Sequence, residues 1–323
     1  MNRVIAAVLA SLGMYVADAA PPSLPGQETW STAPPMHHAR AAHAVVGDGN
    51  AIYALAGTGT GGAPVLAIER FDGKGWHEEG TIPGPGLNAP AAVALNGKIY
   101  LIGGFETDTN IPGDRVLVYD TTTRTWSRAA PLPTPRGGHA AVVLADRIHV
   151  IGGGNAKATI ADHDVFDPAA NAWTALAPLP RAEGSPAVAA FDGKLYAIGG
   201  RSGPADFGAV DIYDPATNSW SAGPPIDPRG TAGAVVYCGA IHVFGGESQA
   251  RQQSLGEVLR LERNGGWARL SPMPTPRNFA RAAILGDAVY VVGGSPTPEP
   301  SHASIGSVVV ERYRATCAPH KPG

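Results

Sequence analysis

Residues 117–153 read LVYDTTTRTWSRAAPLPTPRGGHAAVVLADRIHVIGG, and this stretch decides the fold. It places an aromatic–Asp pair, a tryptophan and a Pro-Arg pair ahead of an apolar segment that ends in two glycines. Within that segment, Ala140 to Leu144 and Ile148 to Ile151 have the pattern of two strands joined by a tight turn. A third strand is predicted through Val165-Phe166 and a fourth at Trp173, so the unit has four strands.

The same pattern repeats along most of the chain. Six tryptophans are separated by 46, 50, 47, 47 and 47 residues, and five glycine pairs that close apolar runs keep the same period. A period of this length is expected of propeller blades, and long apolar runs are typical of strands buried on both faces. The tryptophans are Trp30, Trp76, Trp126, Trp173, Trp220 and Trp267, and the glycine pairs are Gly103-Gly104, Gly152-Gly153, Gly199-Gly200, Gly245-Gly246 and Gly293-Gly294, with Ala56-Gly57 as a weakened version.

The two ends of the repeat array are incomplete in complementary ways. Val308 to Tyr313 has the pattern of the third strand of the last repeat, but no tryptophan follows it. Trp30 precedes the first repeat without a glycine pair. We therefore expect Glu28 to Ser31 to supply the outer strand of the last blade, because this N-terminal strand would close the ring and protect an open edge.

Composition agrees with an all-β chain and excludes several partners. The 323 residues include 42 glycines and 30 prolines, and an interior proline costs a helix about 3 kcal/mol. The net charge is −3 and no run of Lys or Arg exceeds two residues. We therefore expect neither nucleic acid nor an anionic membrane surface as a partner. Separately, we expect the protein to be a monomer.

The first residues have the pattern of an export signal. Val4 to Val16 is mostly apolar, and Ala17-Asp18-Ala19 offers the small-x-small pattern that a signal peptidase reads. The apolar run is shorter than the roughly 20 residues that span a bilayer, and a retained anchor is the alternative. We expect a signal peptide at 1–19, a linker at 20–26, the propeller at 27–316 and a C-terminal tail at 317–323, in a periplasmic or secreted protein that is not inserted in a membrane.

The chain has two cysteines, Cys238 and Cys317. An even number in an exported chain permits a disulfide, which would close a long loop. Two unrelated buried thiols are the alternative, and the sequence leaves both open.

These motifs resemble those of a known repeat family. Tyr119-Asp120, Trp126, Pro135-Arg136 and Gly152-Gly153 together look like a Kelch repeat, and the resemblance extends over residues 27–315. It implies a six-bladed β-propeller, an all-β fold. The sequence departs from the repeat pattern at two positions without changing the number of blades: Ala56 replaces a glycine and Leu261 replaces the aromatic residue.

One loop position points to an anionic ligand. It lies before the innermost strand of every repeat, so its six residues are expected to ring one mouth of the central channel. Four arginines and one glutamate there make this mouth basic on an acidic chain, which attracts anions, and Arg suits bidentate carboxylate recognition. The alternative is that each Arg binds backbone carbonyls between blades. The residues are Arg40, Leu87, Arg136, Glu183, Arg229 and Arg277.

Two resemblances extend this hypothesis. In Kelch substrate adaptors of ubiquitin ligases, Arg at this loop position contacts acidic peptides, which implies anion binding at the four arginines but no ubiquitin role without an adaptor domain. Exported bacterial Kelch mutarotases, which act on the anionic sugar sialic acid, are similar in their signal peptide and six blades. Sugar ring opening needs an acid and a base, and Glu183, Glu247 and His38 are the candidates. The alternative is that both glutamates are solvated loop charges or partners of neighbouring arginines.

The remaining sequence offers no metal or cofactor site. His37-His38 and His43 form the densest histidine cluster, but His43 aligns with His139, which favours structural packing. Tetrahedral metal sites need three or four convergent ligands, so we expect no metal and no cofactor. The predicted function is an exported binding module that recognises an anionic small molecule, an acidic glycan or an acidic peptide. A carbohydrate-active enzyme, an anionic-sugar mutarotase or epimerase, is the alternative.

Overall fold

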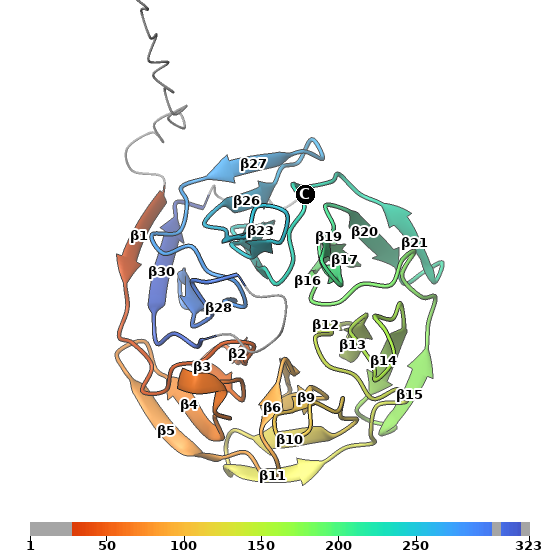
Figure 1. Cartoon of the computed structure of the whole chain (residues 1–323). Helices are drawn as coiled ribbons and strands as arrows, with labels where there is room; N and C mark the ends of the chain where they lie inside the picture. Colours follow the sequence, from red (N-terminus) through yellow and green to blue (C-terminus); the bar gives the residue numbers. More distant parts are fainter. Residues whose placement is uncertain (1–27, 299–304, 318–323) are drawn as a thin grey trace, which may run out of the picture.

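The computed structural model describes residues 28–298 and 305–317, which form six four-stranded antiparallel sheets arranged around a central axis (Figure 1). The predicted all-β, six-bladed propeller is confirmed. The predicted signal peptide and linker lie outside the described residues. In the described part of the chain, the single helical element is a 3₁₀ turn, Thr60–Gly62, so no helix there is long enough to cross a bilayer.

Each blade runs from an innermost strand at the channel to an outermost strand at the rim. The first three blades are β2 (Ala44–Gly47), β3 (Ile52–Leu55), β4 (Ala67–Phe71), β5 (Trp76–Thr81); β7 (Ala91–Leu95), β8 (Lys98–Ile102), β10 (Val116–Asp120), β11 (Thr125–Arg128); and β12 (Ala140–Leu144), β13 (Arg147–Ile151), β14 (His163–Asp167), β15 (Ala172–Ala175). The next two are β16 (Ala187–Phe191), β17 (Lys194–Ile198), β20 (Val210–Asp214), β21 (Ser219–Ala222) and β22 (Gly233–Tyr237), β23 (Ala240–Phe244), β26 (Val258–Leu261), β27 (Trp267–Leu270).

The sixth blade combines strands from the two incomplete ends of the repeat array. Its strands are β28 (Arg281–Leu285), β29 (Ala288–Val292), β30 (Val310–Ala315) and β1 (Glu28–Thr32). β1 pairs antiparallel with β30 and sets Trp30 opposite Tyr313, with ring centroids 5.0 Å apart. The predicted closure of the ring by an N-terminal strand is therefore confirmed.

The repeated tryptophans join successive blades. Each aromatic–Trp pair lies across the two outer strands of one blade, as for Tyr119 and Trp126, whose ring centroids are 5.0 Å apart. The indole Nε1 of Trp126 donates a hydrogen bond to the carbonyl of Thr81 at the end of the preceding blade (3.0 Å). The other five indoles make the same kind of bond, to the carbonyls of Pro34, Ala130, Ala177, Pro224 and Ser271.

The glycine pairs are required at the end of the second strand of a blade, where the chain turns away from the first strand. Gly103 and Gly104 have φ of 54° and 100°, a region that favours glycine. A Cβ at Gly103 would lie 2.6 Å from the carbonyl oxygen of Arg136 in the next blade. The glycines therefore allow close contact between neighbouring blades.

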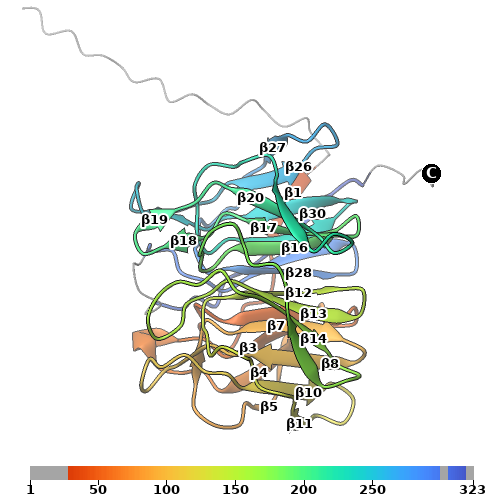
Figure 2. The same ribbon diagram turned by 90° about the vertical axis from the view of Figure 1, so that its right-hand side faces the viewer.

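Short hairpins follow these turns and define one face of the ring, here called the hairpin face (Figure 2). They are β18 (Arg201–Ser202) with β19 (Ala205–Asp206), and β24 (Glu247–Ser248) with β25 (Gln253–Ser254). In the second blade, β6 (Leu87–Asn88) pairs with β9 (Phe105–Glu106), although β7 and β8 lie between them in sequence.

The two cysteines are bonded to each other, which decides the alternative that the sequence left open. Cys238 lies in the turn between β22 and β23 of the fifth blade, and Cys317 follows β30 of the sixth. Their Cα atoms are 4.9 Å apart. The disulfide therefore links two neighbouring blades.

Candidate functional site

The four predicted ligand-binding arginines, Arg40, Arg136, Arg229 and Arg277, do not face the channel mouth. Each is at most 1% exposed. Arg277 donates to the carboxylate of Glu311 (2.7 Å) and to the carbonyls of Gly293 and Val309 (2.8 and 2.9 Å). Their placement at a ligand-binding surface is therefore corrected: these guanidiniums are buried within their own blades, where they bind carbonyl oxygens of the turn after the second strand or carboxylates of the third strand.

The other three arginines occupy equivalent places with small differences. Arg40 binds Glu69 (2.9 Å) and the carbonyl of Ala56 (2.9 Å). Arg136 binds Asp164 (2.6 Å). Arg229 binds the carbonyl of Gly245 (3.3 Å) and lies 3.9 Å from Glu257. The alternative prediction, that each arginine binds backbone carbonyls, agrees with these contacts better than ligand binding does. The carbonyls, however, belong to the same blade as the arginine and not to a neighbouring blade.

Glu183 occupies the arginine position in the fourth blade and is also buried. The guanidinium of Arg181 binds both Glu183 (3.4 Å) and Asp211. Burial raises the pKa of the Glu183 carboxyl to about 8, so this group is protonated near neutral pH. Glu183 is therefore enclosed within its blade and is not a solvated loop charge.

The structure does not bring the three acid–base candidates together. Glu183 and Glu247 lie in the fourth and fifth blades, whereas His38 lies in the first blade and binds Glu78 at 2.8 Å. His43 and His139 are buried, and burial lowers the pKa of His139 to about 3. His139 packs against Gly103 of the neighbouring blade, which confirms the packing interpretation. Among residues 28–298 and 305–317, no three His, Cys, Asp or Glu side chains are grouped to hold a metal ion.

Glu247 contacts the wall of an opening on the hairpin face through Arg201, whereas His38 lines a separate pocket of about 390 Å³ in the first blade. Glu247 is fully buried, binds the guanidinium of Arg201 at 2.6 Å and accepts a hydrogen bond from Asn278 (3.3 Å). Arg201 and Glu247 each follow the glycine pair of their blade, so they hold equivalent positions in neighbouring repeats. This ion pair joins the fourth and fifth blades beside the channel mouth.

Phe279 closes the channel at the hairpin face. Its side chain is fully buried and packs against Ala42 and Ala89, with Phe105 at the edge of the same cluster. The guanidinium of Arg201 lies 5.6 Å from the centre of the Phe279 ring. One phenylalanine of the sixth blade is thus close to residues of the first, second and fourth blades, and we infer that its ring lies across the axis.

Backbone hydrogen bonds narrow the channel at the same level. Each donor lies just before an innermost strand and binds the equivalent carbonyl of the preceding blade. Residues at this position have positive φ even where they are not glycine, for example Ala89 (50°) and Thr231 (59°). The bonds are Ala89 N to Ala42 O (2.7 Å), Gly138 N to Ala89 O (2.8 Å), Ser185 N to Gly138 O (2.5 Å) and Thr231 N to Ser185 O (3.1 Å).

A pocket of about 310 Å³ opens on the hairpin face over the third and fourth blades. Its wall includes an arginine, a lysine, an aromatic ring and several hydroxyl and amide groups, and no carboxylate of the described residues lines it. We call it the hairpin-face pocket. Its main side chains are Phe105, Asn155, Lys157, Thr159, Ser185 and Arg201.

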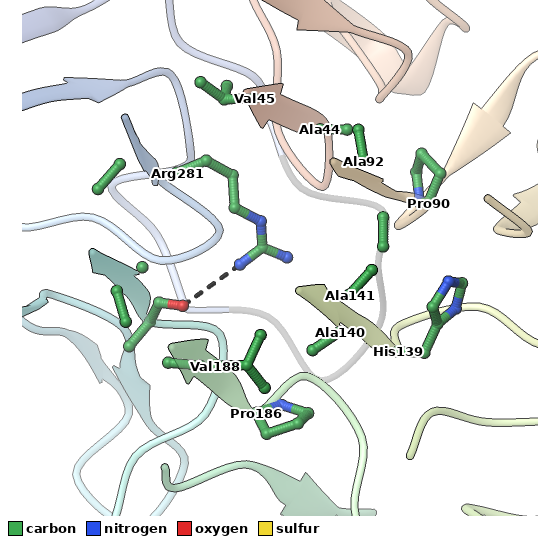
Figure 3. A pocket seen from close by; sticks show the side chains of 16 residues that line it. Ala44, Val45, Pro90, Ala92, His139, Ala140, Ala141, Pro186, Val188 and Arg281 are labelled. Carbon is green, nitrogen blue, oxygen red and sulfur yellow. Dashed lines mark hydrogen bonds between the residues drawn. The ribbon is translucent and has the colours of Figure 1, made fainter. Parts of the chain in front are cut away.

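A second, smaller cavity of about 110 Å³ lies in the central channel (Figure 3). Its walls are mostly alanine and proline, and the guanidinium of Arg281 extends into it. Sequence reasoning singled out neither Arg281 nor Arg201. The signal was present in the repeat alignment, because both replace small or uncharged residues found at the same position in most other blades.

Comparison with known proteins agrees with this architecture. The KLHDC2/KLHL20/DRC7 Kelch-repeats domain matches residues 25–183 and 91–294. A solved structure described as "Structure of YjhT" superposes with a TM-score of 0.74 over 87% of this chain and 96% of that chain, at 17% identity, which shows a shared fold.

Two kinds of curated relatives are similar over shorter stretches. N-acetylneuraminate epimerase from Haemophilus influenzae (strain PittEE) is 32% identical over 115 residues, 33% of this chain and 29% of that protein. Kelch-like protein 35 from Mus musculus is 28% identical over 130 residues, 40% of this chain and 21% of that protein. The matched segments thus span less than a third of either relative.

Proposed function

Because the chain belongs to the Kelch-repeat family, we propose that its propeller is a recognition module whose hairpin-face pocket binds an anionic ligand, namely a carboxylated sugar of an acidic glycan. The observation that carries this proposal is the composition of the pocket, which sets two cationic side chains and no carboxylate of the described residues around about 310 Å³. A pocket of this size suits a small organic ligand.

The side chains of the pocket have complementary tasks in this proposal. Glu247 fixes the Arg201 guanidinium at the pocket wall through a 2.6 Å bond, so little freedom is lost when a ligand binds. Lys157 adds an exposed ammonium group that Glu247 does not neutralise. Phe105 offers an apolar face for a sugar ring, and Asn155 and Thr159 offer hydrogen-bonding groups. This mixture favours an acidic sugar over an acidic peptide.

A mutarotase is the second candidate, favoured by the similarity to N-acetylneuraminate epimerases. Opening and closing a sugar ring requires a proton donor and a proton acceptor. None of the three predicted acid–base residues lines the hairpin-face pocket itself, but the carboxylate of Glu247 is bound to Arg201 of its wall. In this second proposal Glu247 acts with Arg201, and Glu183 takes no part.

Calorimetric titration with N-acetylneuraminate, and with neutral N-acetylmannosamine as the control sugar, tests the binding proposal. We expect the acidic sugar to bind and Lys157→Ala to weaken it about tenfold, a loss of about 1.4 kcal/mol. Lys98→Ala is the matched control, because Lys98 is exposed at the opposite end of its blade. Equal affinities in the two variants would show that the hairpin-face pocket is not the site.

The same samples distinguish binding from catalysis. Proton NMR of a freshly dissolved single anomer follows its interconversion with and without the protein. The mutarotase proposal requires acceleration that Glu247→Gln removes and Glu183→Gln retains. Binding without acceleration leaves the recognition module as the function.

We also propose that the protein is exported and acts as a monomer in the periplasm or outside the cell. The apolar segment and the small-residue motif that ends at Ala19 support this proposal. The N-terminal residue of the protein recovered from a periplasmic extract, determined by mass spectrometry, tests it.

A further inference from the structure

An arginine stands in the channel wall where the other five blades have alanine or glycine. The first residue of each innermost strand pairs with the residue that precedes the glycine pair, for example Ala140 with Ile151 and Arg281 with Val292. Repeat symmetry therefore makes these six positions equivalent. They are Ala44, Ala91, Ala140, Ala187, Gly233 and Arg281.

Among residues 28–298 and 305–317, no carboxylate balances the charge of Arg281. Its Nη1 donates to the carbonyl oxygen of Ala232 at 3.3 Å (Figure 3). In the part of the chain that the structure describes, no carboxylate oxygen comes within 4.0 Å of this guanidinium. Every other arginine that we have described at the hairpin end of the blades has a carboxylate within this distance, as Arg277 has Glu311.

The groups around Arg281 do not supply a negative charge either. His139 lines the same cavity, and burial together with nearby arginines, Arg281 among them, lowers its pKa to about 3, so its ring is neutral. His43 lies close enough for Arg281 to lower its pKa as well. Burial lowers the pKa of Arg281 itself to about 10, which still leaves it charged near neutral pH. Arg281 is partly buried, and its positive charge faces the cavity that it lines.

The dimensions of the cavity limit what can balance this charge. A water molecule needs about 10–15 Å³ of such space, so the cavity of about 110 Å³ has room for a small ion and a few waters. Phe279 lies across the axis two residues before Arg281 and separates the cavity from the hairpin face. A sugar bound in the hairpin-face pocket therefore cannot reach Arg281.

We propose that the central channel is a binding site for a small monovalent inorganic anion of the size of chloride, held by the guanidinium of Arg281. The anion would complete the charge balance of the channel and bring the sixth innermost strand into electrostatic contact with the neighbouring blades. This site is independent of the ligand proposed for the hairpin face.

Thermal unfolding in sodium bromide, compared with sodium gluconate at the same ionic strength, tests the proposal, since gluconate is too large for the cavity. We expect bromide to raise the Tm of the intact protein saturably by about 2–4 °C. Arg281→Ala, which installs the residue of four other blades, is expected to abolish this rise. Arg128→Ala removes one exposed charge from β11 and serves as the control that retains it.

An equal response of the intact protein and Arg281→Ala would overturn the proposal. Crystals grown in bromide give a second, independent readout by anomalous scattering. The expected result is a bromide peak in contact with the Arg281 guanidinium in the intact protein. A channel without such a peak, at a bromide concentration that saturates any thermal response, would also overturn the proposal.

Discussion

At the scale of single residues, the buried arginines explain how the blades hold their shape. Three blades pair an arginine with an acid on the third strand, as Arg40 pairs with Glu69. The second blade has Leu87 and Leu117 at the same two positions, both buried in one apolar cluster. A buried ion pair and a well-packed apolar pair are often energetically interchangeable. The arginine motif therefore serves the blade and not a ligand.

Glu183 leads to a prediction about pH. Its pKa is raised to about 8 in the folded protein, from about 4.5 in the unfolded chain, so the folded state binds more protons between these values. The stabilisation is complete below the unfolded pKa and is lost as the pH rises through about 8. Between about pH 6.5 and pH 8 the protein should lose up to about 1.4 kcal/mol of unfolding free energy per pH unit relative to Glu183→Gln.

Urea unfolding across this range measures the difference. The buried histidines are the same in both proteins, so their contribution to the slope cancels when the intact protein is compared with Glu183→Gln. Glu262→Gln, at a partly exposed glutamate in the same part of the ring, should keep the slope of the intact protein. Parallel curves for the intact protein and Glu183→Gln would mean that Glu183 is ionised in the fold.

At the scale of elements, the outer strands fasten the blades to one another. Every indole Nε1 bonds to a carbonyl near the end of the preceding blade, and Trp30 makes this bond to Ser271 across 241 residues of sequence. β1 therefore completes the sixth blade and links it to the fifth. Without β1, β30 would be the exposed edge strand of the sixth blade.

Removal of β1 should destabilise the whole ring. Loss of the Trp30 side chain alone is expected to cost about 3–5 kcal/mol. A chain that begins at residue 36 should therefore melt well below one that begins at residue 21. Thr29→Ala changes an exposed side chain of the same strand and should have little effect. Equal melting temperatures for the two chains would contradict the role of β1 as the closing strand.

At the scale of the whole molecule, a covalent bond reinforces the same junction. The disulfide joins residues 79 apart in sequence and connects the fifth and sixth blades close to the β1–β30 pair. In the chain-entropy model, a loop of this length stabilises the folded state by about 4 kcal/mol. The ring is thus closed by the pairing of β1 with β30, and the disulfide fastens the C-terminal end of β30 to the fifth blade.

Loss of the disulfide should lower the melting temperature without changing the fold. Cys317→Ser and the double variant Cys238→Ser/Cys317→Ser should both melt several degrees lower, since about 1 kcal/mol shifts the Tm of a large domain by about 2–4 °C. Differential scanning calorimetry under oxidising and reducing conditions measures the shift. A reductant that leaves the Tm of the intact protein unchanged would speak against this stabilisation.

The whole molecule also keeps two cavities apart. Phe279 and the ring of backbone hydrogen bonds separate the hairpin-face pocket from the channel that contains Arg281. The two proposed ligands therefore occupy separate spaces: an acidic sugar in the hairpin-face pocket and a small inorganic anion in the channel.

The repeat of tryptophans and glycine pairs predicted the fold almost completely. Strand pairing within most blades joins neighbouring segments, so apolar alternation and turn residues are enough to locate β12 and β13. The aromatic–Trp pairs lie on adjacent outer strands of one blade for the same reason. Their spacing is a property of the chain itself and does not depend on how distant blades meet. The closing strand β1 pairs with the distant β30 and was predicted from the missing outer strand of the last repeat.

The candidate site was decided by tertiary structure. Arg40, Arg136, Arg229 and Arg277 lie in a loop beside the channel, and the sequence predicts that position correctly but not the direction of the side chains. Acids on the third strand and carbonyls of the glycine turns draw these guanidiniums into the blades. Arg201 and Arg281 lie at the two cavities only because six segments that are distant in sequence converge on one axis. The local pattern sets the strands, whereas exposure of a charge depends on which distant carboxylates and backbone carbonyls the closed ring places around it.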